Sequence, residues 1–174
     1  FRYTLPSTQM VIDDLFLIEN SDDLYILNHH NVSPNAPNEM FDDICLIKLH
    51  NNQFVFEEHY GGSASDRATS IKEYDSNSLI IAGSGYSEDG LFASNNGWAE
   101  GLVLVVSKID GEIIFHHLVG GSRHDNIIEA FPVNGNIVLI GNSNSIDGDI
   151  APLFNVALSA SNCFVMKITE TGSL

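Results

Sequence analysis

The sequence is poor in basic residues. Seven Lys and Arg stand against 23 Asp and Glu in 174 residues, which gives a formal net charge of −16 at pH 7. Because nucleic-acid phosphates need a surface rich in Lys and Arg, this composition argues against a nucleic-acid partner. An acidic surface favours solubility and attracts cations. No run of 18 apolar residues occurs either, so we expect no membrane span.

Cysteine is almost absent, since only Cys45 and Cys163 occur. Each lies in a strand-like apolar run, three residues before Lys48 in one case and four residues before Lys167 in the other. The two side chains are therefore expected in different sheets and on opposite faces. This predicts two buried thiols rather than a disulfide.

Helical periodicity is also missing, because no segment keeps apolar residues at a spacing of three to four for more than two turns. Short runs rich in Val, Ile, Leu and Phe, bounded by Gly, Asn, Asp and Ser, are typical of β-strands. We expect strands near residues 15–19, 24–29, 44–49, 53–59, 69–74, 79–84, 101–109, 112–119, 127–132, 136–142 and 162–168. Residues 101–106 are apolar almost throughout, which indicates a strand covered on both faces.

What the sequence does contain is a repeat. A Gly-Gly-Ser triplet at Gly61 recurs 59 residues later at Gly120, and Asp66 recurs at Asp125 with the same offset. Cutting the chain at equivalent phenylalanines gives units 1–55, 56–114 and 115–174, of which the first is the most divergent. A repeat is a unit that cannot bury its apolar face alone, so the whole chain is expected to form one domain of stacked units.

Four antiparallel strands recurring every 40 to 60 residues or so are typical of a β-propeller blade. The predicted fold class is therefore all-β, with three four-stranded blades. Propellers use about 4 to 8 blades, and the last unit lacks its own fourth strand. We therefore expect a partial propeller, completed either by further repeat units of a longer protein or by other copies of the chain that share a sheet.

The motifs of the repeat resemble the long β-propeller repeats of secreted and cell-surface proteins of Bacteroidetes-type bacteria. The resemblance rests on four segments of the second unit: the Gly-Gly-Ser start at 61–63, Ile80-Ile-Ala-Gly83, Ser87-Glu-Asp-Gly90 and Val106-Ser-Lys-Ile-Asp110. The third unit matches well and the first mainly at 43–49, but Phe56 and Phe115 stand where that family usually has Trp. The resemblance implies an exported, usually non-catalytic module in an extracellular or cell-surface protein.

Two sets of aspartates are candidate sites. Asp89, Asp147 and Asp149 lie in loops where a Gly allows a tight turn, so they are candidate calcium ligands. The alternative to calcium binding is that each of these aspartates forms an Asx-type turn, in which the carboxylate hydrogen-bonds its own backbone. Asp66 and Asp125 are expected at the start of the innermost strands, where they either accept backbone N–H bonds between blades or bind a cation or a sugar hydroxyl.

The loops after the second strands, at 86–100 and 143–161, vary most between units, and variable loops on a rigid frame are where recognition usually lies. Tyr86, Trp98 and Phe154 are the aromatic residues there that could stack on a sugar or anchor a partner.

Two pairs of adjacent histidines, His29-His30 and His116-His117, also occur. Adjacent side chains on a strand point to opposite faces, so neither pair can chelate one ion.

Three functions follow as hypotheses. The first is a non-catalytic scaffold that binds a protein or glycan at a cell surface. The second is a structural subunit whose copies share sheets. The third is a carbohydrate-active enzyme domain, because paired carboxylates can be assembled from distant residues, although the sequence shows no nucleophile elbow or phosphate-binding loop.

Overall fold

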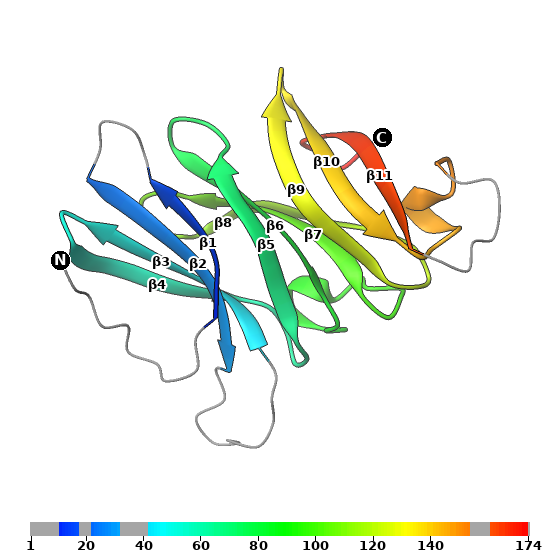
Figure 1. Ribbon diagram of the computed structural model, residues 1–174, viewed down its shortest axis with the longest axis horizontal. Coiled ribbons are helices and arrows are strands. Elements are labelled where there is room, and N and C mark those ends of the chain that lie inside the picture. Colours follow the sequence, from blue (N-terminus) through cyan, green and yellow to red (C-terminus); the bar gives the residue numbers. More distant parts are fainter. Residues whose placement is uncertain (1–10, 18–21, 32–41, 154–160, 174) are drawn as a thin grey trace.

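A computed structural model describes residues 11–17, 22–31, 42–153 and 161–173 of the chain (Figure 1). These residues form three antiparallel β-sheets, and two short 3₁₀ turns are the helical elements of this described part. Each sheet is a meander in which neighbouring strands are joined by hairpins or loops. The all-β prediction is therefore confirmed, and the described sheets form a stack that does not close into a ring.

The first sheet contains β1 (Val11–Leu17), β2 (Asp23–Asn31), β3 (Asp42–His50) and β4 (Gln53–Tyr60), in that order. The hairpin between β3 and β4 turns at Asn51 and Asn52, whose φ angles of 50° and 61° are left-handed. Asn tolerates this conformation better than most residues, so the sequence specifies a two-residue turn here. A β-bulge between Lys48 and Leu49 then shifts the register of the pair by one residue.

The second sheet contains β5 (Asp66–Glu73), β6 (Ser78–Gly85), β7 (Glu100–Ser107) and β8 (Ile113–Val119), with the 3₁₀ turn η1 (Gly90–Phe92) between β6 and β7. The third sheet contains β9 (Asp125–Val133), β10 (Asn136–Ser143) and β11 (Asn162–Thr169), with η2 (Gly148–Ile150) between the last two. Every predicted strand range overlaps an observed strand. Three strands are described in this third sheet.

The sheets stack face to face, and their apolar faces form the core. One cluster joins the first and second sheets through residues such as Tyr25, Leu46 and Phe92. A second joins the opposite face of the second sheet to the third through residues such as Val103, Leu139 and Phe164. The central strand β7 is buried on both faces from Glu100 to Val106, as its continuous apolar run predicts. Stacked antiparallel sheets of this size are blade-like units.

The sheets do not divide the chain at the phenylalanines. Phe56 belongs to β4 of the first sheet and Phe115 to β8 of the second, and a new sheet begins at Asp66 and at Asp125. A period fixes the length of a repeat but not its phase, so the sequence offset is the same for either choice of cut. The chain passes from one sheet to the next at the Gly-Gly-Ser turns.

One prediction about cysteine is wrong. Cys45 is buried on β3, but Cys163 on β11 is exposed, although both thiols are free as expected. On β11 the side chains of Phe164, Met166 and Ile168 face the second sheet, and Cys163 and Val165 lie on the alternate face. That face has no described sheet packed against it, which leaves the thiol accessible.

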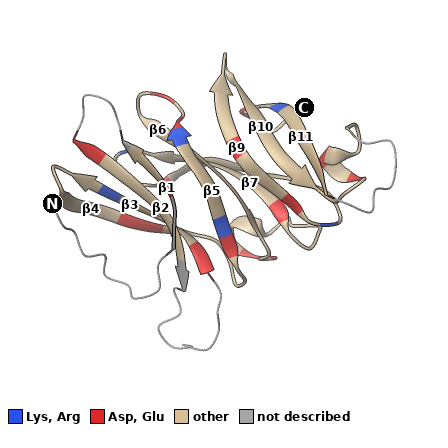
Figure 2. Cartoon of the chain, viewed as in Figure 1, with Lys and Arg blue, Asp and Glu red and all other residues tan. Residues whose placement is uncertain are grey.

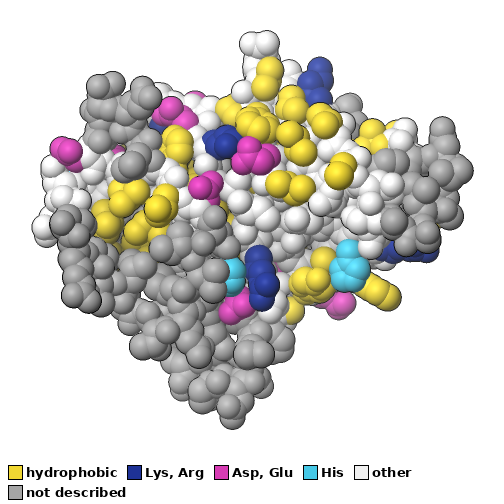
Figure 3. Space-filling view, in the orientation of Figure 1, with side chains coloured by type: hydrophobic (Ala, Val, Ile, Leu, Met, Phe, Trp, Pro, Cys, Tyr) yellow, Lys and Arg dark blue, Asp and Glu magenta, His cyan; other side chains and the backbone are white. Residues whose placement is uncertain are grey.

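Charge and apolar side chains are distributed unevenly over this frame. Acidic residues occur along most of the strands, with few basic residues between them (Figure 2). On the visible surface, apolar side chains gather over the third sheet (Figure 3), where Ile128 and Val133 of β9 are exposed. The described residues contain no helix long and apolar enough to cross a membrane.

Candidate functional site

The Gly-Gly-Ser turns are fixed by the aspartates that open the next sheet. Asp125, which is 1% exposed, accepts a hydrogen bond from the backbone N–H of Gly121 at 2.8 Å. The hydroxyls of Ser143 and Ser145 donate to the same carboxylate, the second at 2.8 Å. Three donors therefore converge on one buried carboxylate. We call this arrangement the latch of the third sheet.

The second sheet has the same latch. Asp66 accepts bonds from the N–H of Gly62 at 2.8 Å and from the hydroxyl of Ser87 at 2.7 Å. Burial raises the pKa of Asp66, and these hydrogen bonds oppose that rise. Asp66 and Asp125 thus begin the first strand of their sheets, as predicted, and their carboxylates hold the turn between neighbouring sheets.

The candidate calcium ligands take part in the same turns. Asp89 accepts the N–H of Ser63 at 2.6 Å, and Asp147 accepts the N–H of Ser122 at 2.8 Å. These bonds span 26 and 25 residues, so each aspartate bonds the turn that precedes its sheet and not its own neighbouring backbone, as an Asx turn would. Bonds to Ser122 lower the pKa of Asp147.

Asp147 and Asp149 line a cavity of about 320 Å³ together with Glu100, which sequence analysis did not single out. Burial raises the pKa of Glu100. Within the described ranges, however, these three carboxylates do not bring ligand oxygens within 4.8 Å of one another. Asp89 lies in the corresponding loop of the second sheet. Calcium binding at these loops stays a prediction.

Two of the three predicted aromatic residues lie at one place. Tyr86 follows β6 and is 51% exposed, and Trp98 precedes β7 and is 70% exposed. The rings of both lie edge-on to the imidazole of His124, with centroid distances of 5.7 Å from Tyr86 and 5.1 Å from Trp98. His124 belongs to the next Gly-Gly-Ser turn, so the cluster bridges two sheets. The third predicted residue, Phe154, lies outside the described residues.

The loop that carries Trp98 is held against the third sheet. Ala99 forms a one-residue parallel bridge with His124, and its carbonyl accepts the N–H of Asp125 at 2.8 Å. A side chain at Gly97 would meet the carbonyl oxygen of Gly121 at 2.5 Å, so glycine is required for this close approach. The bridge at Ala99 and the close approach at Gly97 therefore position Trp98.

A polar pocket of about 210 Å³ lies beside the aromatic cluster, between the second and third sheets. Tyr86 and His124 form part of its wall, and the remaining lining is mostly amide and hydroxyl: Ser84, Asn126, Asn142, Asn144 and Ser161, with Ala99 and Asp125. The Oδ1 atom of Asn126 is buried and has no hydrogen-bond partner among the described residues. A buried amide oxygen without a donor is costly unless water or a ligand supplies one.

Sequence analysis missed His124 and the three asparagines of this pocket. They lie near the start of β9 and near the end of β10, and their nearness depends on how two sheets stack. It also missed a group formed by Cys45, Glu57 and His59 on the first sheet, whose ligand atoms all lie within 4.8 Å of one another.

Comparisons with known proteins add little to this geometry. No protein-family model and no curated protein matches the chain. Among solved structures, the chain is similar to a candidate conserved lipoprotein from Clostridium novyi NT, solved at 2.70 Å resolution. The TM-score is 0.49 at 12% sequence identity, and the match covers 94% of this chain and 90% of that one. So distant a likeness does not identify a ligand.

Proposed function

We propose that this chain is a non-catalytic, propeller-type module of an exported or cell-surface protein, and that it binds a glycan between its second and third sheets. The observation that carries the proposal is the placement of Tyr86 and Trp98, both exposed, around His124 at the edge of a polar pocket. Backbone contacts at Gly97 and Ala99 hold the loop of Trp98 beside His124, so a ligand would meet a preformed surface.

The lining of the pocket favours a glycan over a protein. Protein hot spots are well-packed and desolvated, whereas the wall here carries several amides and hydroxyls. Amides such as those of Asn126, Asn142 and Asn144 can pair with sugar hydroxyls, and an aromatic face offers an apolar surface to a sugar ring. The pocket is smaller than the roughly 300–1,000 Å³ of sites for drug-sized ligands, so it suits one sugar residue.

The same lining supports binding rather than hydrolysis. Glycoside hydrolysis generally needs two carboxyl groups that flank the scissile bond. Asp125 supplies the one carboxylate among the residues that line this pocket, and its oxygens already accept the three bonds of the latch.

A glycan panel tests the proposal, with Trp98→Ala and Tyr86→Ala as variants. Phe54→Ala is the matched control, because Phe54 is as exposed as Tyr86 but lies on β4 of the first sheet. We expect the unaltered chain and the Phe54 variant to bind the same glycans, and the Trp98 variant to lose binding. Binding that survives both pocket substitutions would refute the site. A protein ligand that depends on Trp98, with no glycan bound, would refute the ligand class.

The third sheet favours a second function, assembly through a shared sheet. Val165 on the edge strand β11 is 65% exposed, and β11 has one described neighbour, β10. An unpaired edge beside an exposed apolar face can accept a strand from another copy or from a further repeat unit. Mass measurement in solution separates these cases: a monomer at all concentrations would remove assembly between copies.

A further inference from the structure

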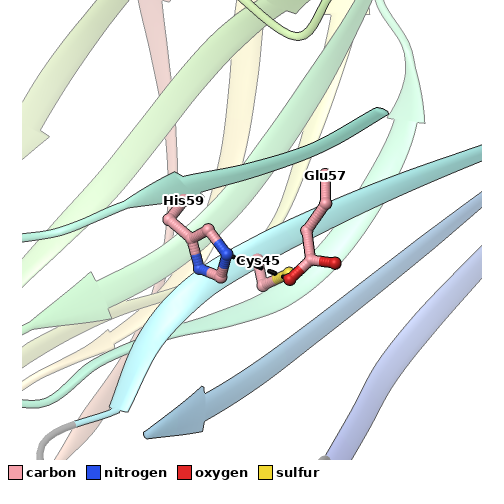
Figure 4. A group of neighbouring side chains, drawn as sticks. All are labelled: Cys45, Glu57 and His59. Carbon is pink, nitrogen blue, oxygen red and sulfur yellow. Dashed lines mark hydrogen bonds and ion pairs between the residues drawn. The ribbon is translucent and has the colours of Figure 1, made fainter. Parts of the chain in front are cut away.

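Three metal-ligating side chains of different chemistry converge on the first sheet. Cys45 lies on β3, and Glu57 and His59 lie on β4 (Figure 4). Cys45 is directly opposite His59 in the register, and Glu57 precedes His59 by two residues. Residues two apart on a strand share a face with the residue opposite them, so all three side chains lie on the same face.

The geometry is that of a compact ligand set. The thiol sulfur, one carboxylate oxygen and one imidazole nitrogen all lie within 4.8 Å of one another. His59 Nε2 is 3.1 Å from Glu57 Oε1. The side chains point toward one another from two neighbouring strands (Figure 4), and small rotamer adjustments would bring all three atoms to metal-ligand distances of about 2.0–2.3 Å.

We propose that Cys45, Glu57 and His59 form a binding site for a Zn²⁺-class transition-metal ion. Thiolate, imidazole and carboxylate are the ligands that Zn²⁺ uses in proteins, and sites with three protein ligands keep a fourth position for water or another ligand. Ca²⁺ and Mg²⁺ take oxygen ligands, so the sulfur excludes them here. The site is distinct from the aspartate loops and from the pocket beside Trp98.

Burial and charge suit a divalent cation. The sulfur is fully buried, whereas the side chains of Glu57 and His59 are 22% and 33% exposed, so an ion can enter from solvent and reach the sulfur. On binding, the thiol loses its proton to solvent and the sulfur–metal bond forms. One thiolate and one carboxylate then balance the two positive charges of the ion, which leaves no net charge at a half-buried position.

The surroundings also support the sulfur as a ligand. Asn28 of β2 lies directly opposite Cys45, on the side away from His59. Packing against Ile26, Ile47 and Leu49 fixes the position of Cys45 on the sheet.

Titration of tag-free protein with Co²⁺ tests the site, because a cobalt–thiolate bond gives an intense charge-transfer absorption. We expect this absorption to saturate at one Co²⁺ per chain and to be displaced by Zn²⁺. Cys45→Ser should abolish it, whereas Cys163→Ser, which removes the exposed thiol of β11, should leave it unchanged.

His59→Ala and Glu57→Gln keep the test decisive if Cys45→Ser fails to fold, because both positions are partly exposed. Each should weaken Co²⁺ binding by at least about 10-fold without changing the melting temperature of the metal-free protein. An absent charge-transfer band in the unaltered chain, a band that Cys163→Ser removes, or unchanged affinity in both β4 variants would overturn the proposal.

Discussion

The substitution that tests the stacking of the sheets most directly is one that removes the latch carboxylate of Asp125. Asp125→Ala leaves the N–H of Gly121 and the hydroxyls of Ser143 and Ser145 without their acceptor in a buried place. Hydrogen bonds to a charged group are worth about 1.5–3 kcal/mol each, so three give an upper bound of about 4.5–9 kcal/mol. Burial of the carboxylate costs several kcal/mol, and losing that cost offsets part of the effect. We expect a net destabilisation of about 3 kcal/mol.

Two companion variants make this prediction specific. Asp125→Asn keeps the shape and one acceptor oxygen, so it should cost about 1–2 kcal/mol. Asp149→Ala is the control, because this exposed aspartate accepts one long bond, at 3.4 Å from the N–H of Gly120, and should cost less than about 0.5 kcal/mol.

Urea denaturation followed by far-UV circular dichroism measures these differences, with unchanged m-values required for a comparison. Hydrogen exchange at the Gly121 amide should accelerate in Asp125→Ala, since its acceptor is gone. If Asp125→Ala lay within 0.5 kcal/mol of the unaltered chain, the buried carboxylate would not hold the turn, and the reasoning about the latch would be wrong.

Three further predictions follow from the structure. Burial, and next the charge of Asp66, raise the pKa of Asp43 to about 6, so between pH 4 and 6 the folded state holds a proton that the unfolded state has lost. The free energy of unfolding should therefore fall as the pH rises through this window. If Asp43→Asn kept the same pH dependence, this explanation would be contradicted. A side chain at Gly121 would meet Asp147 Oδ1 at 2.5 Å, whereas one at Gly135 meets nothing within 4 Å. Gly121→Ala should therefore cost more than the roughly 1 kcal/mol expected of Gly135→Ala at its positive φ, in a thermal melt of both. If Asp89 and Asp147 bind calcium in addition to the backbone N–H groups that they accept, Ca²⁺ added to metal-free protein should raise the melting temperature, and an unchanged melting temperature would reject the calcium site.

The strands were predictable because each is a short apolar run with strong turn signals. The continuous run 101–106 correctly indicated a strand buried on both faces. The sequence cuts at Phe56 and Phe115 did not mark the sheet boundaries, which follow the Gly-Gly-Ser triplets. The roles of Asp66 and Asp125 could be anticipated in part, since their recurrence pointed to a backbone acceptor.

The sites were harder to predict, because both depend on contacts that the repeat does not specify. His124 meets Trp98 across two sheets, and this meeting requires the parallel bridge at Ala99. If the strands paired evenly from the Asn51-Asn52 turn, Cys45 would lie opposite Glu58. The bulge at Lys48 shifts the register so that Cys45 lies opposite His59 instead. One inserted residue thus creates the thiol–imidazole neighbour.

Trp98 is the single tryptophan of the chain, so its fluorescence reports directly on the proposed glycan pocket. Titration with the glycans that score highest on a panel is the most direct measurement of the central proposal. We predict a saturable change in the intensity and wavelength of emission, with a midpoint that Tyr86→Ala raises and Phe54→Ala leaves unchanged. Emission that stays constant while a glycan demonstrably binds would place the ligand elsewhere and contradict the account.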